Sequence, residues 1–364
     1  MPVKNEHEVE LVDTAEGCAD LAHHWDALVA DSAADSMFLT HNWLQTWMSC
    51  FLGAGRRLFV LVVRDGGRPF AIAPWYLATS RCAGLRSREV RFLGTPETGS
   101  DYLDVMVRHG REREAANAIY RFLFGVGSCH WDQLSLSDIP ADSPFLFHFM
   151  NRLDEDGKFA ELRRHAYIPR ATLPETAERF FAGLSSGRRA RYRQDWRRLA
   201  EHSGVHHVTC HRPDAEEGLR RFFALYDAKS GHDGSTLSPF LRAFCDSSTV
   251  VAPQIDILSA EGCDVAALIH LAYGNALHLL LMATDKSFDR RISVGNALLG
   301  KCIENAIDAG FACYDFLKGG EEYKFHWANG AKTSLSLQVG QRRFASYLCT
   351  SSRLLRYLAK ALLR

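Results

Sequence analysis

The sequence predicts an α+β protein built from two copies of one unit. Both halves of the chain contain β-rich runs joined by glycine turns, and both halves end in a similar phrase after a helical stretch. These phrases read WDQLSL over residues 131–136 and YDFLKG over residues 314–319. Helix, hairpin, helix and strand therefore occur twice, which favours a duplicated α+β unit over a barrel or a doubly wound sheet.

Length and composition agree with two globular domains. The chain has 364 residues, of which 47% are hydrophobic and 24% are charged, and one hydrophobic core seldom serves so long a chain. We expect a first domain over residues 1–160, a second over residues 161–345 and an amphipathic helix over residues 346–364. The basic side chains of that last segment alternate with leucines, which suits packing against the parent domain or contact with a membrane surface.

Charge and cysteine usage exclude several classes of protein. Lys plus Arg equals Asp plus Glu at 43 each, so no overall field attracts DNA. The 10 cysteines are scattered and form no Cys-x-x-Cys pair, as is usual in a reducing compartment. The charged N-terminus lacks the apolar run of a signal peptide. We expect a cytoplasmic protein, or one held peripherally at the inner membrane.

The hairpins follow from turn chemistry, and the helices follow from apolar spacing. Asp65, Gly66 and Gly67 separate two β-rich runs in the first half, and glycine supplies the positive φ that such turns need. Glu261-Gly262 and Gly274-Asn275 divide residues 254–285 into three strands. Apolar periodicity predicts helices over residues 188–202 and 296–309.

The most informative stretch covers residues 284–330. A strand ends near Ala283, a polar loop follows, and a helix begins at about Gly295. The unpaired amides of that helix start can bind an anion such as pyrophosphate, and glycine there would let a ligand approach the backbone. An ordinary strand-to-helix turn is the alternative. A helix start contributes about 0.3 to 1 kcal/mol whereas micromolar binding needs about 8 kcal/mol, so further cofactor contacts are required.

An arginine-rich helix precedes the second set of strands. Residues 188–198 hold six arginines, and Arg189, Arg193 and Arg197 line one face. Such a ridge could bind an anionic acceptor, cofactor phosphates or RNA, with Tyr192 and Trp196 stacking on bases. A helix with a core-facing aromatic stripe and solvated arginines explains the pattern equally well.

Two other signals are set aside. Residues 183–187 fit the Gly-x-Ser-x-Gly pattern of hydrolases, but helical spacing precedes the serine where a strand is needed. His202, His206, His207 and His211 lie close in sequence to Cys210, yet strand alternation divides them between two faces, so no metal site is predicted. His232-Asp233 could form an acid/base pair or a turn.

An ordered set of motifs resembles a known family. The set comprises Leu184-Ser185-Ser186 with the arginines that follow, Ser293-Val294-Gly295, Asp315-Phe316-Leu317, Gly319, and residues 323–327, YKFHW. It resembles the acetyltransferase branch of the GNAT superfamily that is associated with cellulose and exopolysaccharide biosynthesis, which is similar in turn to Fem-type aminoacyltransferases. The likeness is good over residues 174–327 and looser in the first half. It implies tandem GNAT-like domains, each a mixed, mainly antiparallel sheet flanked by helices, with the first a degenerate copy.

The resemblance also implies a reaction and its residues. An amine or hydroxyl would attack the thioester of acetyl-CoA or another acyl-CoA directly, without a metal. Asp315 would act as base or orient the acceptor, Tyr323 would protonate the leaving thiolate, and Lys324 would hold a phosphate or carboxylate. The cofactor would be bound by Arg290, Arg291, Ser293, Val294, Gly295 and Asn296. The acceptor would be bound by Arg189, Arg193, Lys229, His232, Asp233 and Trp327.

The acceptor on this hypothesis is a small molecule, a lipid-linked intermediate or a saccharide, and two alternative functions stay open. The chain could transfer an aminoacyl group from tRNA, a less favoured partner, with the arginine helix as the RNA contact. It could also be a non-catalytic scaffold that keeps the fold, because the phosphate loop over residues 290–297 matches the family pattern only in part.

Overall fold

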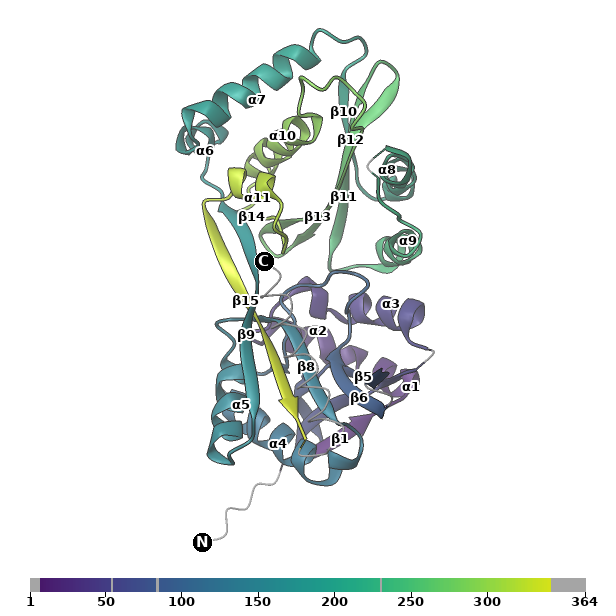
Figure 1. Cartoon of the computed structure of the whole chain (residues 1–364), viewed down its shortest axis with the longest axis vertical. Coiled ribbons are helices and arrows are strands. Elements are labelled where there is room, and N and C mark those ends of the chain that lie inside the picture. The colour runs from purple at the N-terminus through teal and green to yellow at the C-terminus, as the bar shows by residue number, and fades with distance from the viewer. Residues whose placement is uncertain (1–6, 54, 83–84, 230, 342–364) are drawn as a thin grey trace. The chain divides into compact units, whose positions relative to one another are not determined.

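The chain forms two compact units, shown in Figure 1. The computed structural model describes residues 7–53, 55–82, 85–229 and 231–341. The first unit comprises the described residues up to Ala166 and those from Thr333 onward, and the second comprises Tyr167–Lys332. The sequence places the second domain over residues 161–345, whereas the structure returns the chain to the first unit at Thr333. The helix expected over residues 346–364 lies outside the described residues.

The first unit contains two sheets and their covering helices. A four-stranded sheet has the order β1-β3-β4-β7, and a second run of strands has the order β15-β8-β6-β5-β2. All recorded pairings in this unit are antiparallel except that of β6 with β8. The elements are β1 (Glu8–Val12), α1 (Ala15–Asp20), α2 (Ala22–Ala30), η1 (Met37–Leu39), α3 (His41–Phe51), β2 (Arg56–Leu58), β3 (Val60–Asp65), β4 (Arg68–Ala73), β5 (Trp75–Cys82), β6 (Leu85–Phe92), β7 (Met106–Val107), α4 (Glu112–Phe124), η2 (Val126–Cys129), β8 (Gln133–Pro140) and α5 (Pro144–Glu155).

The second unit is built on strands in the order β10-β11-β12-β13-β14-β9. Here only the pairing of β13 with β14 is parallel. Two strands, β9 (Ala160–Thr172) and β15 (Gly330–Gly340), begin in one unit and end in the other. The remaining elements are α6 (Ala177–Gly183), α7 (Ser186–Leu199), β10 (His206–Cys210), α8 (Ala215–Lys229), α9 (Leu237–Ser247), β11 (Ala252–Ala260), β12 (Cys263–Tyr273), β13 (Ala276–Thr284), α10 (Val294–Asp308), β14 (Cys313–Asp315) and α11 (Glu322–Trp327).

The local chemistry explains these elements. Gly66 and Gly67 have φ of 55° and 79°, and Asp65 pairs with Arg68 across the turn, which confirms the first hairpin. Gly262 and Gly274 have φ of 76° and 56° at the two turns of the β11-β12-β13 meander, a conformation that costs glycine little. Ser185 caps the start of α7 directly after α6. The helix α6 and not a strand precedes that serine, so residues 183–187 do not form the strand-turn-helix arrangement of a hydrolase nucleophile.

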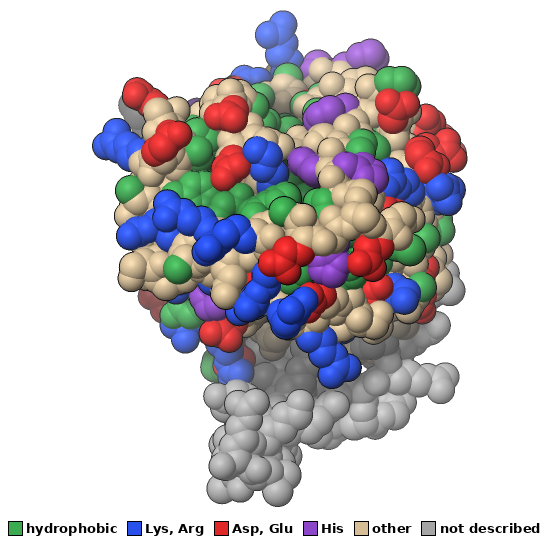
Figure 2. Space-filling model, turned by 90° about the horizontal axis from the view of Figure 1, so that it is seen from above, with side chains coloured by type: hydrophobic (Ala, Val, Ile, Leu, Met, Phe, Trp, Pro, Cys, Tyr) green, Lys and Arg blue, Asp and Glu red, His purple; other side chains and the backbone are tan. Residues whose placement is uncertain are grey.

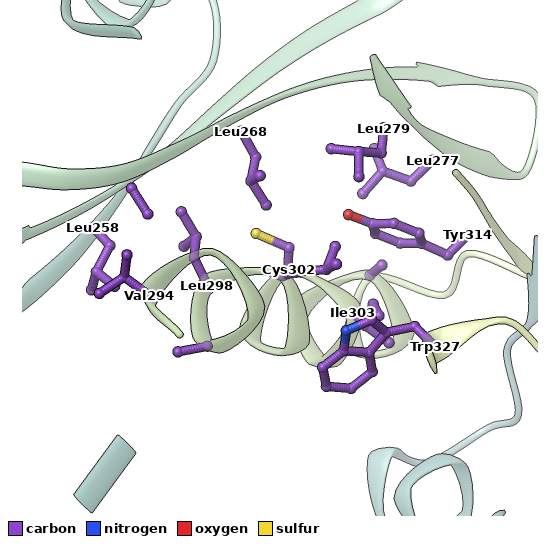
Figure 3. Packing of buried hydrophobic residues seen from close by; sticks show 14 of the residues in the cluster. Leu258, Leu268, Leu277, Leu279, Val294, Leu298, Cys302, Ile303, Tyr314 and Trp327 are labelled. Atoms are coloured by element: carbon purple, nitrogen blue, oxygen red, sulfur yellow. The ribbon is translucent and has the colours of Figure 1, made fainter. Parts of the chain in front are cut away.

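The core of the second unit lies between the sheet and α10. Leu268, Leu277 and Leu279 face Cys302 and Ile303 of the helix, as Figure 3 shows. The opposite face of the sheet packs against α8 (Figure 1). Among the described residues, no helix combines the length and the apolar character needed to cross a bilayer. The fold is thus a mixed, mainly antiparallel sheet flanked by helices, as the sequence predicts.

Candidate active site

The sheet of the second unit opens between β13 and β14. Three residues of β13, 276–278, pair with residues 313–315 of β14, and the structure records no further pairing on that side. On its other side β13 stays paired with β12 as far as Thr284. In that ladder Ile269 pairs with Leu281, and the next residue, His270, pairs with Leu279. Leu280 is therefore an extra, bulged residue. Among the described residues, the end of β13 therefore has no recorded strand partner on the side of the opening.

The start of α10 adjoins this opening. Within the described part of the chain, the backbone N–H groups of Val294, Gly295 and Asn296 have no protein acceptor. The N–H of Ser293 donates to Asp195 Oδ1 at 3.3 Å. Three amides of the first turn, together with the positive end of the helix dipole, are available to an anion.

A single cleft of about 450 Å³ connects these features. The cleft is lined by Met282 and Thr284 of β13, by the first turn of α10 and by Tyr323 of α11. Five of the six expected cofactor residues line the cleft as well: Arg290, Ser293, Val294, Gly295 and Asn296. The sixth, Arg291, is not among its lining residues, and its guanidinium bonds the carboxylate of Asp289 at 2.9 Å. The cleft is large enough for part of a cofactor.

Gly295 is required for helix packing. A Cβ at this position would lie 2.8 Å from Thr284 Cγ2 and 3.0 Å from Met282 Sδ. The missing side chain therefore lets α10 pack closely against β13, and Gly295 also lines the cleft, where its expected contact with a ligand stays a prediction. The ligand-facing groups are the amides of the helix start.

Asp315 and His278 lie where the two strands part. The Asp315 carboxylate is 1% exposed, forms an ion pair with Arg170 Nε at 3.0 Å and accepts the N–H of Leu317 at 2.9 Å. His278 faces Asp315 across the last pair of the ladder. Both Asp315 oxygens are thus engaged, so this carboxylate is better suited to orient a neighbour than to take a proton itself.

His278 has the features of a base, although it is not among the residues that line the cleft, and no motif in the sequence marks it. Its Nδ1 lies 3.1 Å from the carbonyl oxygen of Leu271. That nitrogen therefore donates its N–H, and Nε2 carries a lone pair. Burial lowers the pKa of His278, and the Asp315 charge opposes this shift. The side chain is consequently neutral at physiological pH.

Three residues of the α11 motif, Tyr323, Lys324 and Trp327, lie in different surroundings. Tyr323 lines the cleft, and burial raises its pKa, so the phenol keeps its proton. Lys324 is buried, and its Nζ contacts Lys318 O at 2.8 Å and Glu321 Oε2 at 3.2 Å, which closes the preceding loop. Trp327 packs in the core and donates to Asn296 Oδ1 at 3.3 Å (Figure 3).

The residues expected to bind the acceptor fall in separate places. Lys229 Nζ lies 3.5 Å from Asp285, which lines the cleft, so the C-terminal end of α8 adjoins that cavity. Beyond α8, His232 stacks on Tyr226 of that helix, and Asp233 accepts the N–H of Ser235 at 2.8 Å.

The two expected arginines of α7 lie elsewhere. Arg189 donates to the carbonyl oxygens of Phe181, Ala182 and Leu184 at the end of α6. Arg193 lines a separate groove, and neither side chain is among those that line the cleft.

The α7 helix also braces the loop before α10, which sequence reasoning missed. Arg191 Nη2 and Arg198 Nη1 both donate to Arg291 O, at 3.2 and 2.6 Å. Asp195, 1% exposed, accepts the N–H of Ser293. The α7 helix thus fixes two backbone groups of this loop, the carbonyl oxygen of Arg291 and the N–H of Ser293. The surface around the top of this unit combines a row of basic side chains with a hydrophobic strip, as Figure 2 shows.

A buried polar network lies under α10. Asp256 accepts hydrogen bonds from His207 at 2.9 Å, Thr209 at 2.7 Å and Gln254 at 2.8 Å, and His270 Nδ1 lies 3.0 Å away. Burial would raise the Asp256 pKa, but these donors hold it well below its usual range. Among the described residues, His207, Asp256 and Cys302 are the one group near enough together to hold a metal ion. Four polar partners already satisfy the carboxylate, so we interpret the group as a structural network.

Comparison with known proteins points to one fold. Residues 186–325 match the model of a family described as the acetyltransferase (GNAT) domain. A search of curated proteins finds no match.

Three solved structures resemble nearly the whole chain. The L-PGS from Bacillus licheniformis is 12% identical, with a TM-score of 0.54 and coverage of 93% of this chain and 96% of that one. FemX is 11% identical, with a TM-score of 0.55 and coverage of 90% and 96%. A tandem GNAT protein from the clavulanic acid biosynthesis pathway is 14% identical, with a TM-score of 0.51 and coverage of 92% and 100%. The chain therefore has a GNAT-type fold, and the acetyltransferase match falls on the unit that contains the cleft.

Proposed function

We propose that the chain is an acyltransferase that takes an acyl group from an acyl-CoA and passes it directly to an amine or hydroxyl. One observation carries the proposal: a single cleft joins the end of β13 beyond its pairing with β14, the unpaired amides of α10 and the phenol of Tyr323. A thioester donor needs these three features, namely a backbone edge for its amide-containing arm, a site for its phosphates and a proton for its leaving sulfur.

The phosphate site fits a pyrophosphate in charge. The amides of Val294, Gly295 and Asn296 would receive it, with the exposed Arg290 beside them. Two carboxylates also line the cleft, but both are paired. Asp285 lies near Lys229, and Asp289 bonds Arg291. The unpaired amides and Arg290 are thus the groups that would receive an anion in this cleft.

The chemistry divides between His278 and Tyr323. His278 Nε2 would accept the proton of the attacking amine or hydroxyl, while the Asp315 charge stabilises the resulting imidazolium. Tyr323 would donate its proton to the thiolate that leaves. Asp315, held by Arg170, acts as an orienting group. Lys324 supports the loop before α11 through Lys318 and Glu321.

The first test measures the donor and the reaction separately. Thermal unfolding with and without acetyl-CoA should show stabilisation, because a ligand at 100 times its Kd contributes about 2.7 kcal/mol. Release of free thiol should then require an acceptor, drawn from a panel of amines, hydroxylated saccharides and lipid-linked sugars. We propose the latter two as natural acceptors, in envelope or exopolysaccharide biosynthesis. No shift with millimolar acetyl-CoA or longer acyl-CoAs would indicate a scaffold that kept only the fold.

A second candidate function is aminoacyl transfer from tRNA. It is favoured by a groove of about 610 Å³ beside α7, where Arg193 and Arg197 flank Tyr192 and Trp196. Arginines beside aromatic rings suit single-stranded RNA. Ionic strength distinguishes the two donors, because tRNA binding falls steeply with salt whereas coenzyme A binding falls mildly.

A further inference from the structure

A second cavity lies on the other side of the α10 start. It has a volume of about 180 Å³ and is lined by residues of α7, α10 and α11, including Arg188, Arg191, Tyr192, Asn296, His326 and Trp327. We call it the α7 pocket. Asn296 lines both this pocket and the cleft described above, and α11 contributes Tyr323 to the cleft and Trp327 to the pocket. The two cavities are therefore neighbours, with Asn296 of the first turn of α10 lining both.

The α7 pocket has a positive wall. Arg188 is exposed and uses one N–H for His326 O at 2.9 Å, which leaves the rest of its five-donor fork available. Arg191 forms an ion pair with Asp195 at 3.2 Å. Asp195 also accepts the Ser293 N–H, so its charge is compensated from two sides. Guanidinium forks match the oxygens of a phosphate.

The pocket also has a rigid aromatic wall. Tyr192 and Trp327 meet edge to face with ring centroids 5.7 Å apart, and Phe181 stacks on Tyr192. A Cβ on Gly300 would lie 2.7 Å from Trp327 Cη2 and would also overlap Tyr192. The backbone of α10 therefore supports both rings directly. Fixed aromatic side chains suit contact with a flat heterocycle.

We propose that the α7 pocket binds the nucleotide end of the donor, a phosphorylated nucleoside. This inference rests on the proposed function, because it assigns one end of the ligand whose other end enters the cleft. A volume of 180 Å³ is too small for a whole cofactor but suits one fragment of it. Coenzyme A carries such a nucleotide, and the phosphopantetheine arm of a carrier protein lacks one. A donor that carries a nucleotide should therefore bind more tightly than a donor that carries phosphopantetheine alone.

Calorimetric titration of the full chain with three probes tests the assignment. The probes are coenzyme A, dephospho-coenzyme A without its 3′-phosphate, and 4′-phosphopantetheine. Arg188→Gln should weaken coenzyme A about tenfold, as expected for one charged hydrogen bond, and leave 4′-phosphopantetheine unchanged. The loss should be smaller for dephospho-coenzyme A. Arg193→Gln is the matched control, since Arg193 lies on the same helix and lines a different groove.

A second variant blocks the space itself. Gly187 lines the pocket, and a Cβ there meets no atom within 4 Å. Gly187→Leu should fill the cavity, keep the fold by thermal unfolding and weaken coenzyme A selectively. Gly183→Leu is its control, at an open position outside the pocket.

The possible results distinguish a failure of the pocket assignment from a failure of the proposed acyl-CoA function. If all probes lose affinity equally in Arg188→Gln, or if Gly187→Leu binds coenzyme A as the native chain does, the pocket assignment is overturned and the acyl-CoA function stands. If the native chain binds none of the three probes, the proposed function fails first.

Discussion

At the scale of single residues, His278 acquires its character from its neighbours. Its Nδ1 is committed to a backbone carbonyl oxygen, its ring is buried, and a paired carboxylate lies opposite. Burial favours the neutral ring, whereas Asp315 favours the charged one. The lowered pKa shows that burial is the larger effect here.

This leads to a prediction about pH. Because the folded-state pKa lies below the ordinary value of about 6.5, the acid limb of kcat/KM should lie below pH 6.5. The unfolded chain binds this proton more readily, so stability from this group should be present above about pH 6.5 and decrease as pH falls toward the folded pKa. His278→Gln should remove the limb and slow transfer about 10²- to 10⁴-fold. The control is His206→Gln, which changes an exposed histidine. If the acid limb is unchanged in His278→Gln, His278 is not the base.

A prediction about Gly295 separates packing from ligand binding. Gly295→Val should destabilise the fold by about 1 to 3 kcal/mol, because its side chain would overlap Thr284 and Met282. Gly187→Ala adds a methyl group in a helix with open space, so it should stabilise by about 0.5 to 1 kcal/mol. Chemical denaturation measures both variants. Equal midpoints for the two would contradict the packing role.

The candidate site has one part whose residues are consecutive in the sequence, and this part can be predicted. Another part is formed by residues that lie far apart in the sequence, and this part cannot. Residues 290–296 are one continuous segment, made of a loop and the first turn of α10, so their proximity can be inferred from the local pattern. Asp195 reaches Ser293 across 98 positions, and Arg191 reaches Arg291 across 100. His278 meets Asp315 only because β14 pairs in parallel with β13. No local pattern encodes these contacts.

At the scale of elements, α7 determines the position of the loop before α10. Arg198→Ala removes the 2.6 Å bond to Arg291 O. The loop should then present the α10 amides less accurately, so the KM for acyl-CoA should rise several-fold while kcat stays nearly constant. Arg197→Ala, at an exposed neighbour that lines the outer groove, is the matched control. A fall in kcat with an unchanged KM would show that α7 acts on the chemical step instead.

The hairpins and helices are predictable because their causes are local. Turn glycines specify the meander, and apolar spacing specifies α7 and α10 within two or three residues of their observed limits. The bulge at Leu280 and the opening after His278 depend on which strand pairs with which. These two features create the cleft, and strand register is decided by packing across the sheet.

At the scale of the whole molecule, the repeat in the sequence has a structural counterpart. The phrase at residues 131–136 leads into β8, and the phrase at residues 314–319 begins in β14. Each of these strands takes part in the one recorded parallel pairing of its unit, with β6 and β13 respectively. Similar phrases thus occupy equivalent positions. The division of the chain is harder to predict, since β15 returns to the first unit after the second is complete.

The last prediction concerns how much chain the catalytic unit needs. The family match covers residues 186–325, but β14 pairs with residues 170–172 of β9, and Arg170 neutralises the buried Asp315. A fragment of residues 186–325 would expose the edge of β14 and leave that charge unpaired, at a cost of about 3 to 5 kcal/mol.

That fragment should aggregate or unfold without cooperativity, whereas residues 167–332 should unfold cooperatively in urea. Arg170→Met in the full chain isolates the charge effect from the missing strand and should lower stability by a similar amount. The missing segment before residue 186 also removes Ala171, Leu173 and Phe180 from the core. If the shorter fragment unfolds with the same midpoint as the longer one, β9 is dispensable and the second unit ends at the family boundary.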